Sequence, residues 1–106
     1  MIRFSFLPKE QFHELAEPLF ALLHANMEPM VPDGWTFDEW RAAVGDGLKC
    51  ANRQLVLMND DAAGLVGFFQ YHVSDTAFVR EEIQIAAKEQ RKGLLRRLYR
   101  WLIPQM

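Results

Sequence analysis

Apolar residues alternate with polar ones at the start of the chain and then follow helical spacing. The alternation over residues 2–6 predicts a first strand that ends at Pro8. From residue 9 to about residue 26 the apolar positions recur every three or four residues, which predicts a helix. Pro18 cannot donate the hydrogen bond that a helix interior needs, so we expect a kink or a break there.

A loop and a second helix are predicted next. Two prolines and one glycine, Pro29, Pro32 and Gly34, predict a loop over residues 27–35. Thr36 and Glu39 have the spacing of a capping box, in which both side chains bind backbone groups at a helix start. The second helix should therefore begin at Thr36 and fade between residues 45 and 47.

The second half of the chain predicts a meander followed by a helix. Residues 54–58, 65–73 and 77–86 have the length and apolar content of strands, and turn residues separate them. From Leu94 onward the apolar residues form one stripe with arginines beside it, as in an amphipathic helix. The order β-α-α-β-β-β-α predicts a single α+β domain with a mainly antiparallel sheet over residues 1–106.

Composition narrows the class of protein without naming its function. The chain has 106 residues, of which 50% are hydrophobic and 25% charged, close to ordinary globular usage. It contains neither an apolar run of membrane-spanning length nor the apolar region of a signal peptide. Cys50 is the single cysteine and cannot form an internal disulfide. These features are typical of a cytoplasmic protein.

Charge is distributed unevenly along the chain. Residues 1–87 carry 6 basic and 13 acidic side chains, whereas residues 88–106 carry 6 basic side chains and one acidic side chain. A basic end on an acidic body predicts an anionic ligand at one place. Contact of the basic helix with nucleic acid is a weaker alternative, because Trp101 lies on the packing stripe.

The basic turn Gln90-Arg91-Lys92-Gly93 joins the last strand to the last helix. Such a turn directs backbone N–H groups outward where a helix dipole begins, which suits a phosphate or a diphosphate. Gly93 has no side chain to obstruct the anion, and the neighbouring cations would balance its charge. The alternative is a solvated helix start with no function.

The residues from 81 to 103, together with the element order, resemble the first part of GNAT-type N-acetyltransferases. In that family a Q/R-x-x-G-x-G/A loop opens the third helix, and its amides hold the pyrophosphate of acetyl-CoA. The resemblance implies that the loop residues bind this co-substrate and that Ile85 and Ala87 offer backbone groups to its pantetheine arm. The loop residues are Gln90, Arg91, Lys92, Gly93, Leu94, Leu95 and Arg96.

The chain departs from the family pattern in three ways. Ala87 stands where the family often has proline, and Leu95 stands where it has glycine or alanine. The family also continues with a fifth strand, a fourth helix and a tyrosine that protonates the leaving thiolate, whereas this sequence stops at Met106. We therefore expect a GNAT-like domain that lacks the C-terminal strands and helix.

Glu81 and Glu82 are the candidates for a general base that takes a proton from an amine. In strict alternation Glu81 shares a face with Ile83 and Ile85, where burial would raise its pKa toward neutrality, as a base needs. Strands at this place in the family commonly carry a bulge, which would swap the faces of the two glutamates. The alternative is that each is a surface or paired carboxylate.

Two main functions stay open. The first is acetyl transfer from acetyl-CoA to a small-molecule or peptide amine, with the missing half supplied by a second chain or by further sequence. The second is a truncated, non-catalytic remnant that acts as a binding or oligomerisation module. The outer edge of the strand over residues 77–86 predicts a homo-oligomer, since unpaired strand edges tend to pair with another chain. The three histidines have no metal-ligand spacing, so no metal site is expected.

Overall fold

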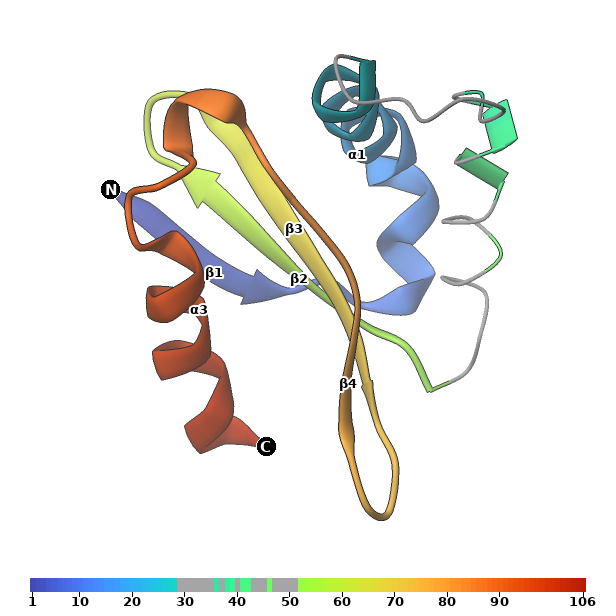
Figure 1. Cartoon of the computed structure of the whole chain (residues 1–106), viewed down its shortest axis with the longest axis vertical. Helices are drawn as coiled ribbons and strands as arrows, with labels where there is room; N and C mark the ends of the chain where they lie inside the picture. The colour runs from blue at the N-terminus through green and yellow to red at the C-terminus, as the bar shows by residue number, and fades with distance from the viewer. Residues whose placement is uncertain (29–35, 37, 40, 43–45, 47–51) are drawn as a thin grey trace.

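The computed structural model describes residues 1–28, 36, 38–39, 41–42, 46 and 52–106 (Figure 1). Its main elements are β1 (Ile2–Phe6), α1 (Phe12–Met27), β2 (Gln54–Asp60), β3 (Gly64–Val73), β4 (Phe78–Ile85) and α3 (Leu94–Leu102). Short 3-10 turns are η1 (Lys9–Gln11), η3 (Ala87–Glu89) and η4 (Ile103–Gln105). The predicted α+β class is confirmed.

The four strands form one antiparallel sheet in the order β1-β2-β3-β4. The predicted meander therefore corresponds to β2, β3 and β4, and β1 pairs with the free side of β2. Within the part of the chain that the structure describes, β1 and β4 are the two edge strands.

The two helices cover opposite faces of this sheet (Figure 1). Each face of the sheet buries its own cluster of apolar side chains. The α1-face core contains Leu19, Leu23, Leu55, Leu57 and Phe68, and the α3-face core contains Val56, Met58, Phe69, Leu94, Leu98 and Leu102. The apolar stripe predicted from the sequence is thus the buried face of α3.

Helix α1 runs without a break through Pro18, from Phe12 to Met27, so of the two expected outcomes the break is wrong and the kink stays a prediction. Proline removes one hydrogen bond of the helix. The apolar residues that follow it are almost fully buried, with Leu19 1% and Leu23 0% exposed. Their packing holds the helical backbone in place, because tertiary burial supplies most of the stability of such a helix.

The start of the predicted second helix is confirmed. The N–H of Glu39 donates to Oγ1 of Thr36 over 3.2 Å, and that hydroxyl donates in turn to the Glu39 carboxylate. Residues 38–39, 41–42 and 46 are helical. The loop predicted over residues 27–35 is wrong at residues 27 and 28, which are helical, and its residues 29–35 lie outside the described residues. Residues 45 and 47, where this helix was expected to fade, lie outside them too.

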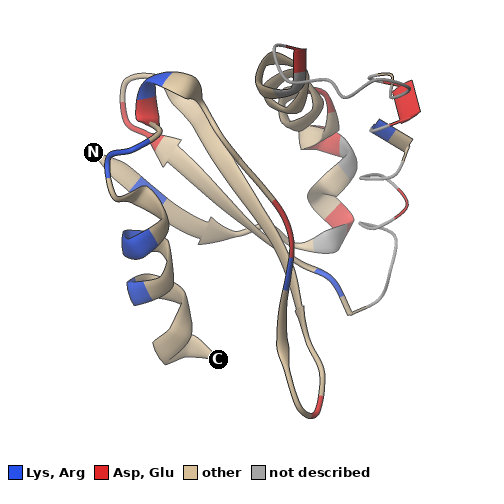
Figure 2. Ribbon diagram, in the orientation of Figure 1, with Lys and Arg blue, Asp and Glu red and all other residues tan. Residues whose placement is uncertain are grey.

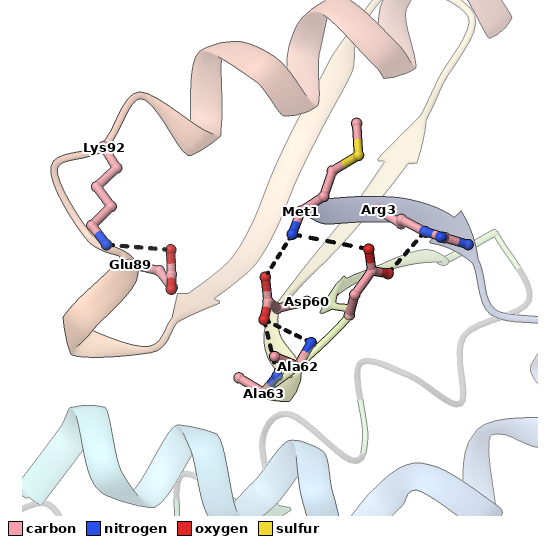
Figure 3. Close-up of polar contacts among 8 residues, drawn as sticks. Met1, Arg3, Asp60, Ala62, Ala63, Glu89 and Lys92 are labelled. Atoms are coloured by element: carbon pink, nitrogen blue, oxygen red, sulfur yellow. Dashed lines mark hydrogen bonds and ion pairs between the residues drawn. The ribbon is translucent and has the colours of Figure 1, made fainter.

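Asp60 ties the amino terminus to the turn between β2 and β3 (Figure 3). One carboxylate oxygen lies 3.1 Å from the Met1 ammonium, and the other accepts the N–H groups of Ala63 and Ala62 over 2.9 and 3.0 Å. These hydrogen bonds, the one from Ala63 first, lower the pKa of Asp60 to about 2.

The described helices include none that is both long and apolar enough to cross a membrane.

Candidate functional site

The candidate site begins with a bulge between β3 and β4. Gln70 pairs with Glu82, but the next residue of β3, Tyr71, pairs with Arg80. Glu81 is therefore the extra residue of β4 and has no partner on β3. A bulge of this kind shifts the alternation of side chains along the bulged strand.

The bulge places both glutamates on the face of the sheet that α1 covers. Glu82 lies opposite Gln70, and Glu81 contacts His72, which shares this face with Gln70. Ile83 packs on the opposite face, in the α3-face core. The strict alternation that grouped Glu81 with Ile83 is thus wrong. The bulge itself was expected, but it brings the two carboxylates to one face and does not swap them.

Glu81 is anchored by two basic side chains. Its Oε2 lies 2.9 Å from Nη1 of Arg53, and its Oε1 lies 2.7 Å from Nδ1 of His72. Arg53 also donates to Oε1 of Gln70 over 2.9 Å, and Gln70 is only 2% exposed. Both oxygens of Glu81 thus lie near a basic side chain, which favours a structural role for this carboxylate at the bulge. Its role as a base stays a prediction.

Glu82 has the properties that a general base requires. Burial of its carboxyl group raises its pKa, while the side-chain amide of Gln84 and the backbone N–H of Ile83 act in the opposite direction. The Nε2 of Gln84 donates to Oε1 of Glu82 over 2.5 Å. A half-buried carboxylate with a raised pKa accepts a proton nearer neutrality than an exposed one does. Of the two predicted bases, Glu82 fits better.

The outer edge of β4 presents backbone groups beside Glu82. The N–H of Ala86 donates to the carbonyl of Val66 on β3 over 2.7 Å, so Ala86 faces into the sheet. Since backbone groups alternate in direction along a strand, those of Ile85 and Ile83 point outward. The Ile85 carbonyl accepts side-chain N–H groups from Asn26, at 2.9 Å, and from Gln90, at 2.8 Å.

The turn after β4 has the backbone shape of an anion site. Arg91 and Gly93 are both left-handed, with φ of 65° and 74°, and Gly93 is the N-cap of α3. A non-glycine residue in this region costs about 1–2 kcal/mol, so Arg91 is held there by its surroundings. Among the described residues no side chain caps the first turn of α3. The first N–H groups of a helix have no partner within the helix, so a diphosphate could bind them here.

The predicted loop residues divide into two groups in the structure. Arg91, Lys92 and Arg96 are exposed, and Lys and Arg residues occur in the turn and in α3 (Figure 2). Lys92 lies 3.8 Å from Glu89, its neighbour in the preceding 3-10 turn (Figure 3). Leu94 is buried and Leu95 packs against the α3-face core, so both can offer an anion only their backbone.

Gln90 and Ala87 use their polar groups within the turn. The N–H of Gln90 donates to the carbonyl of Ala87 over 3.2 Å, and the Gln90 side chain returns to Ile85. The turn therefore closes on itself, which leaves the Ala87 carbonyl engaged. Its predicted role toward pantetheine stays a prediction.

Sequence reasoning missed three residues of this site: Asn26, Arg53 and Gln84. Asn26 is in the last turn of α1 and meets β4 only because α1 crosses the sheet there. Nothing in the sequence marks that contact. Arg53 could have been sought from the sequence, because Gln70 is a polar residue within a largely apolar strand. A buried polar side chain needs a hydrogen-bond partner, and Arg53 is the partner of Gln70.

Solved structures of acetyltransferases share this fold across nearly the whole chain. The ribosomal-protein-alanine N-acetyltransferase of Brucella melitensis biovar Abortus 2308 matches with a TM-score of 0.65 and 19% identity over 99% of this chain and 71% of its own. The ribosomal-protein-S18-alanine N-acetyltransferase of Escherichia coli gives 0.64 and 14%, over 99% and 59%. The PaiA N-acetyltransferase of Thermoplasma acidophilum, solved with coenzyme A, gives 0.64 and 11%, over 99% and 74%.

These matches establish a GNAT-type fold, as the sequence predicted. The chain spans only 59% of the length of the Escherichia coli protein and 71% of the Brucella protein. No protein-family model and no curated protein matches the sequence. At identities below 20% the likeness concerns the fold alone, so the function must be argued from the residues of the site.

Proposed function

We propose that this chain transfers an acetyl group from acetyl-CoA to an amine by direct attack, with Glu82 as the general base. The observation that carries the proposal is the layout of β4. A half-buried carboxylate with a raised pKa precedes an outward-facing backbone edge, and that edge leads directly into an uncapped, basic helix start. These three features match the three parts of the reaction: amine, pantetheine arm and diphosphate.

The diphosphate would lie at the amino end of α3. The free N–H groups of the first helical turn and the helix dipole favour a negative charge there. Arg91 and Lys92 add exposed positive charge in the same turn. The side chains of Leu94 and Leu95 turn into the core and leave this approach clear. The departure of Leu95 from the family pattern is therefore compatible with binding.

The pantetheine arm would lie along the outer edge of β4. Its amides can exchange hydrogen bonds with an exposed strand edge as a neighbouring strand would. Ile83 and Ile85 direct their backbone groups to this side. The Asn26 and Gln90 amides that now bind the Ile85 carbonyl show that this oxygen accepts N–H groups of the amide type.

The chemistry assigned to Glu82 is proton removal. The acceptor binds as an ammonium ion, which loses a proton to the Glu82 carboxylate and becomes a nucleophilic amine. Its nitrogen then forms the new C–N bond as the C–S bond breaks, and the second proton released from nitrogen goes to the leaving thiolate. General base catalysis by a positioned carboxylate typically contributes about 10²–10⁴-fold to such a rate.

Tyr99 does not serve as the acid for the thiolate. Its hydroxyl lies 3.4 Å from Nη1 of Arg80, and its ring packs against Phe69 and Phe78. These contacts belong to the α3 face of the sheet, whereas Glu82 is on the α1 face. No acid for the thiolate is assigned within the described residues.

Calorimetric titration with coenzyme A tests the proposed donor site. Gly93→Asp places a carboxylate at the amino end of α3 and should abolish binding. Gly64→Asp is a matched control, because Gly64 also has a positive φ, of 79°, and an added Cβ meets nothing within 4 Å at either position. Equal affinity in the two variants would remove the turn from the site.

The second candidate function is a non-catalytic module with the same fold. The observation that favours it is the engaged Ile85 carbonyl, since two side-chain amides already satisfy the acceptor that the pantetheine arm would use. Titration and turnover separate the candidates. Binding of coenzyme A with no acetylation of a panel of amines would favour the module, and acetylation that Glu82→Gln abolishes would exclude it.

A further inference from the structure

A chain of hydrogen bonds runs from the end of α1 to the proposed base. The Nδ2 of Asn26 donates to Oε1 of Gln84 over 2.9 Å. The Nε2 of Gln84 donates to Oε1 of Glu82 over 2.5 Å. Asn26 and Gln84 are partly buried, and Glu82 lies beside Gln84 on the face that α1 covers. Two elements far apart in the sequence thus meet at one carboxylate.

The groups at the two ends of this series of hydrogen bonds determine which atom donates at each step. The Ile85 carbonyl can only accept, and it lies 2.9 Å from Nδ2 of Asn26, so the NH₂ group of Asn26 must face β4. The second hydrogen of the Asn26 NH₂ group then points to Oε1 of Gln84. Because the oxygen of the Gln84 amide faces Asn26, its NH₂ group faces Glu82. An ionised carboxylate also only accepts. Reversing either amide would set two acceptors against each other.

We propose that Asn26 and Gln84 are positioning residues for Glu82: Asn26 fixes the orientation of the Gln84 amide, and Gln84 holds the Glu82 carboxylate by donating to it. This inference rests on the proposed role of Glu82 as the base. It adds that the end of α1 sets the ionisation and the orientation of a group on β4. Asn26 touches no reacting atom, so it acts only through Gln84.

The arrangement gives the base two useful properties. Burial raises the pKa of Glu82, and the hydrogen bond from Gln84 opposes that shift, so the carboxylate stays ionised at a lower pH than burial alone would allow. The bond also occupies Oε1 and restricts rotation of the carboxylate. A base held in one orientation reaches the ammonium proton with less loss of freedom.

The test is the pKa of Glu82 in three variants, measured by carbon-13 NMR of the side-chain carboxyl carbons and assigned with Glu82→Gln. Gln84→Leu removes the donor and should raise the pKa of Glu82 by about one unit, the equivalent of about 1.4 kcal/mol. Asn26→Ala frees the Gln84 amide to reverse and should raise it by a smaller amount. In the double variant Asn26→Ala should add nothing, because Gln84 no longer transmits its effect.

Matched substitutions control for general perturbation. Gln54→Leu makes the same change on the exposed end of β2, and Asn59→Ala makes it near the other end of that strand; neither should move the pKa of Glu82. Gln84→Met keeps a straight side chain and replaces Gln84→Leu if that variant does not fold. A shift with Gln84→Leu but none with Asn26→Ala would overturn the role of Asn26. An equal shift from Asn26→Ala in both backgrounds would overturn transmission through Gln84.

The pH dependence of acetylation separates this inference from the proposed function. If Asn26 and Gln84 position the base, the acid limb of kcat/KM moves to higher pH in their variants, and the lost orientation also lowers the rate at high pH. A loss that is uniform across pH, with the acid limb in its original place, indicates a merely structural role and overturns the inference. If the pKa of Glu82 changes in the variants as expected but the parent protein acetylates no amine, the hydrogen bonds from Asn26 through Gln84 to Glu82 are supported and the proposed function is refuted.

Discussion

Arg53→Met tests whether the bulge in β4 depends on the contact between Arg53 and Glu81. Arg53 is 18% exposed and Glu81 26% exposed, and their charged groups lie 2.9 Å apart. The same arginine nitrogen satisfies Gln70, which is 2% exposed. Methionine keeps the length of the stem and removes only the guanidinium. The perturbation therefore removes one charged hydrogen bond and leaves one buried acceptor unsatisfied.

The magnitude follows from these contacts. Loss of the charged hydrogen bond costs about 2 kcal/mol, and the buried acceptor left unsatisfied on Gln70 adds about 1 kcal/mol. The Nε of Arg53 is itself buried without an acceptor among the described residues, so its removal returns about 1 kcal/mol. We expect Arg53→Met to lower the free energy of unfolding by about 2 kcal/mol.

Urea denaturation followed by circular dichroism measures this change, with Arg3→Met as the control. Arg3 lies 3.0 Å from Asp61, almost the same separation, but the two side chains are 74% and 50% exposed. An exposed pair contributes about 0–1 kcal/mol. The reasoning fails if both arginine variants cost the same, or if Arg53→Met and Glu81→Gln are additive within about 0.5 kcal/mol, since partners in contact should couple.

Three further predictions concern the base, the amino terminus and the sheet edge. Glu82→Gln should lower kcat/KM at pH 7 by about 10²–10⁴-fold, whereas Glu81→Gln should lower it less, because Glu81 is paired with Arg53; a larger loss in Glu81→Gln reverses the assignment. The pKa of Asp60 is lowered from 3.8 to about 2, so its ionised carboxylate stabilises the fold above pH 3.8, and this stabilisation is lost as the pH falls through 2. The difference in melting temperature between the parent and Asp60→Asn should therefore shrink over that pH interval. A difference that stays constant would contradict the prediction. Among the described residues no further strand pairs with the outer edge of β4, which begins at exposed Phe78, and this edge predicts a homo-oligomer. A monodisperse monomer in light scattering at micromolar concentration would count against it.

The periodicity of the sequence predicted the elements well because burial enforces it. The stripe at Leu94, Leu98 and Leu102 describes a face that is buried in the structure, and the alternation over residues 2–6 describes a face that is partly buried at Ile2 and Phe4. Pro18 does not break the helix, because the packing of the residues after it outweighs one lost hydrogen bond. Local propensity is a weak guide where tertiary burial is strong.

The candidate site was less predictable because its geometry depends on contacts distant in the sequence. The turn at Gly93 could be found, since its backbone shape is encoded locally. The face that Glu81 takes could not, because it depends on a bulge opposite Gln70 and on Arg53 from another strand. The contact of Asn26 with Gln84 joins residues 58 positions apart. No local pattern records it.

The measurement that tests the central claim most directly is a nitrogen-15 NMR titration of the protein with coenzyme A. The account predicts that amide signals of residues 91–96 and of Ile83 and Ile85 shift together, with one dissociation constant, while signals of the turn at Gly64 stay in place. Signals that do not move at millimolar coenzyme A, or that move only elsewhere, would contradict it.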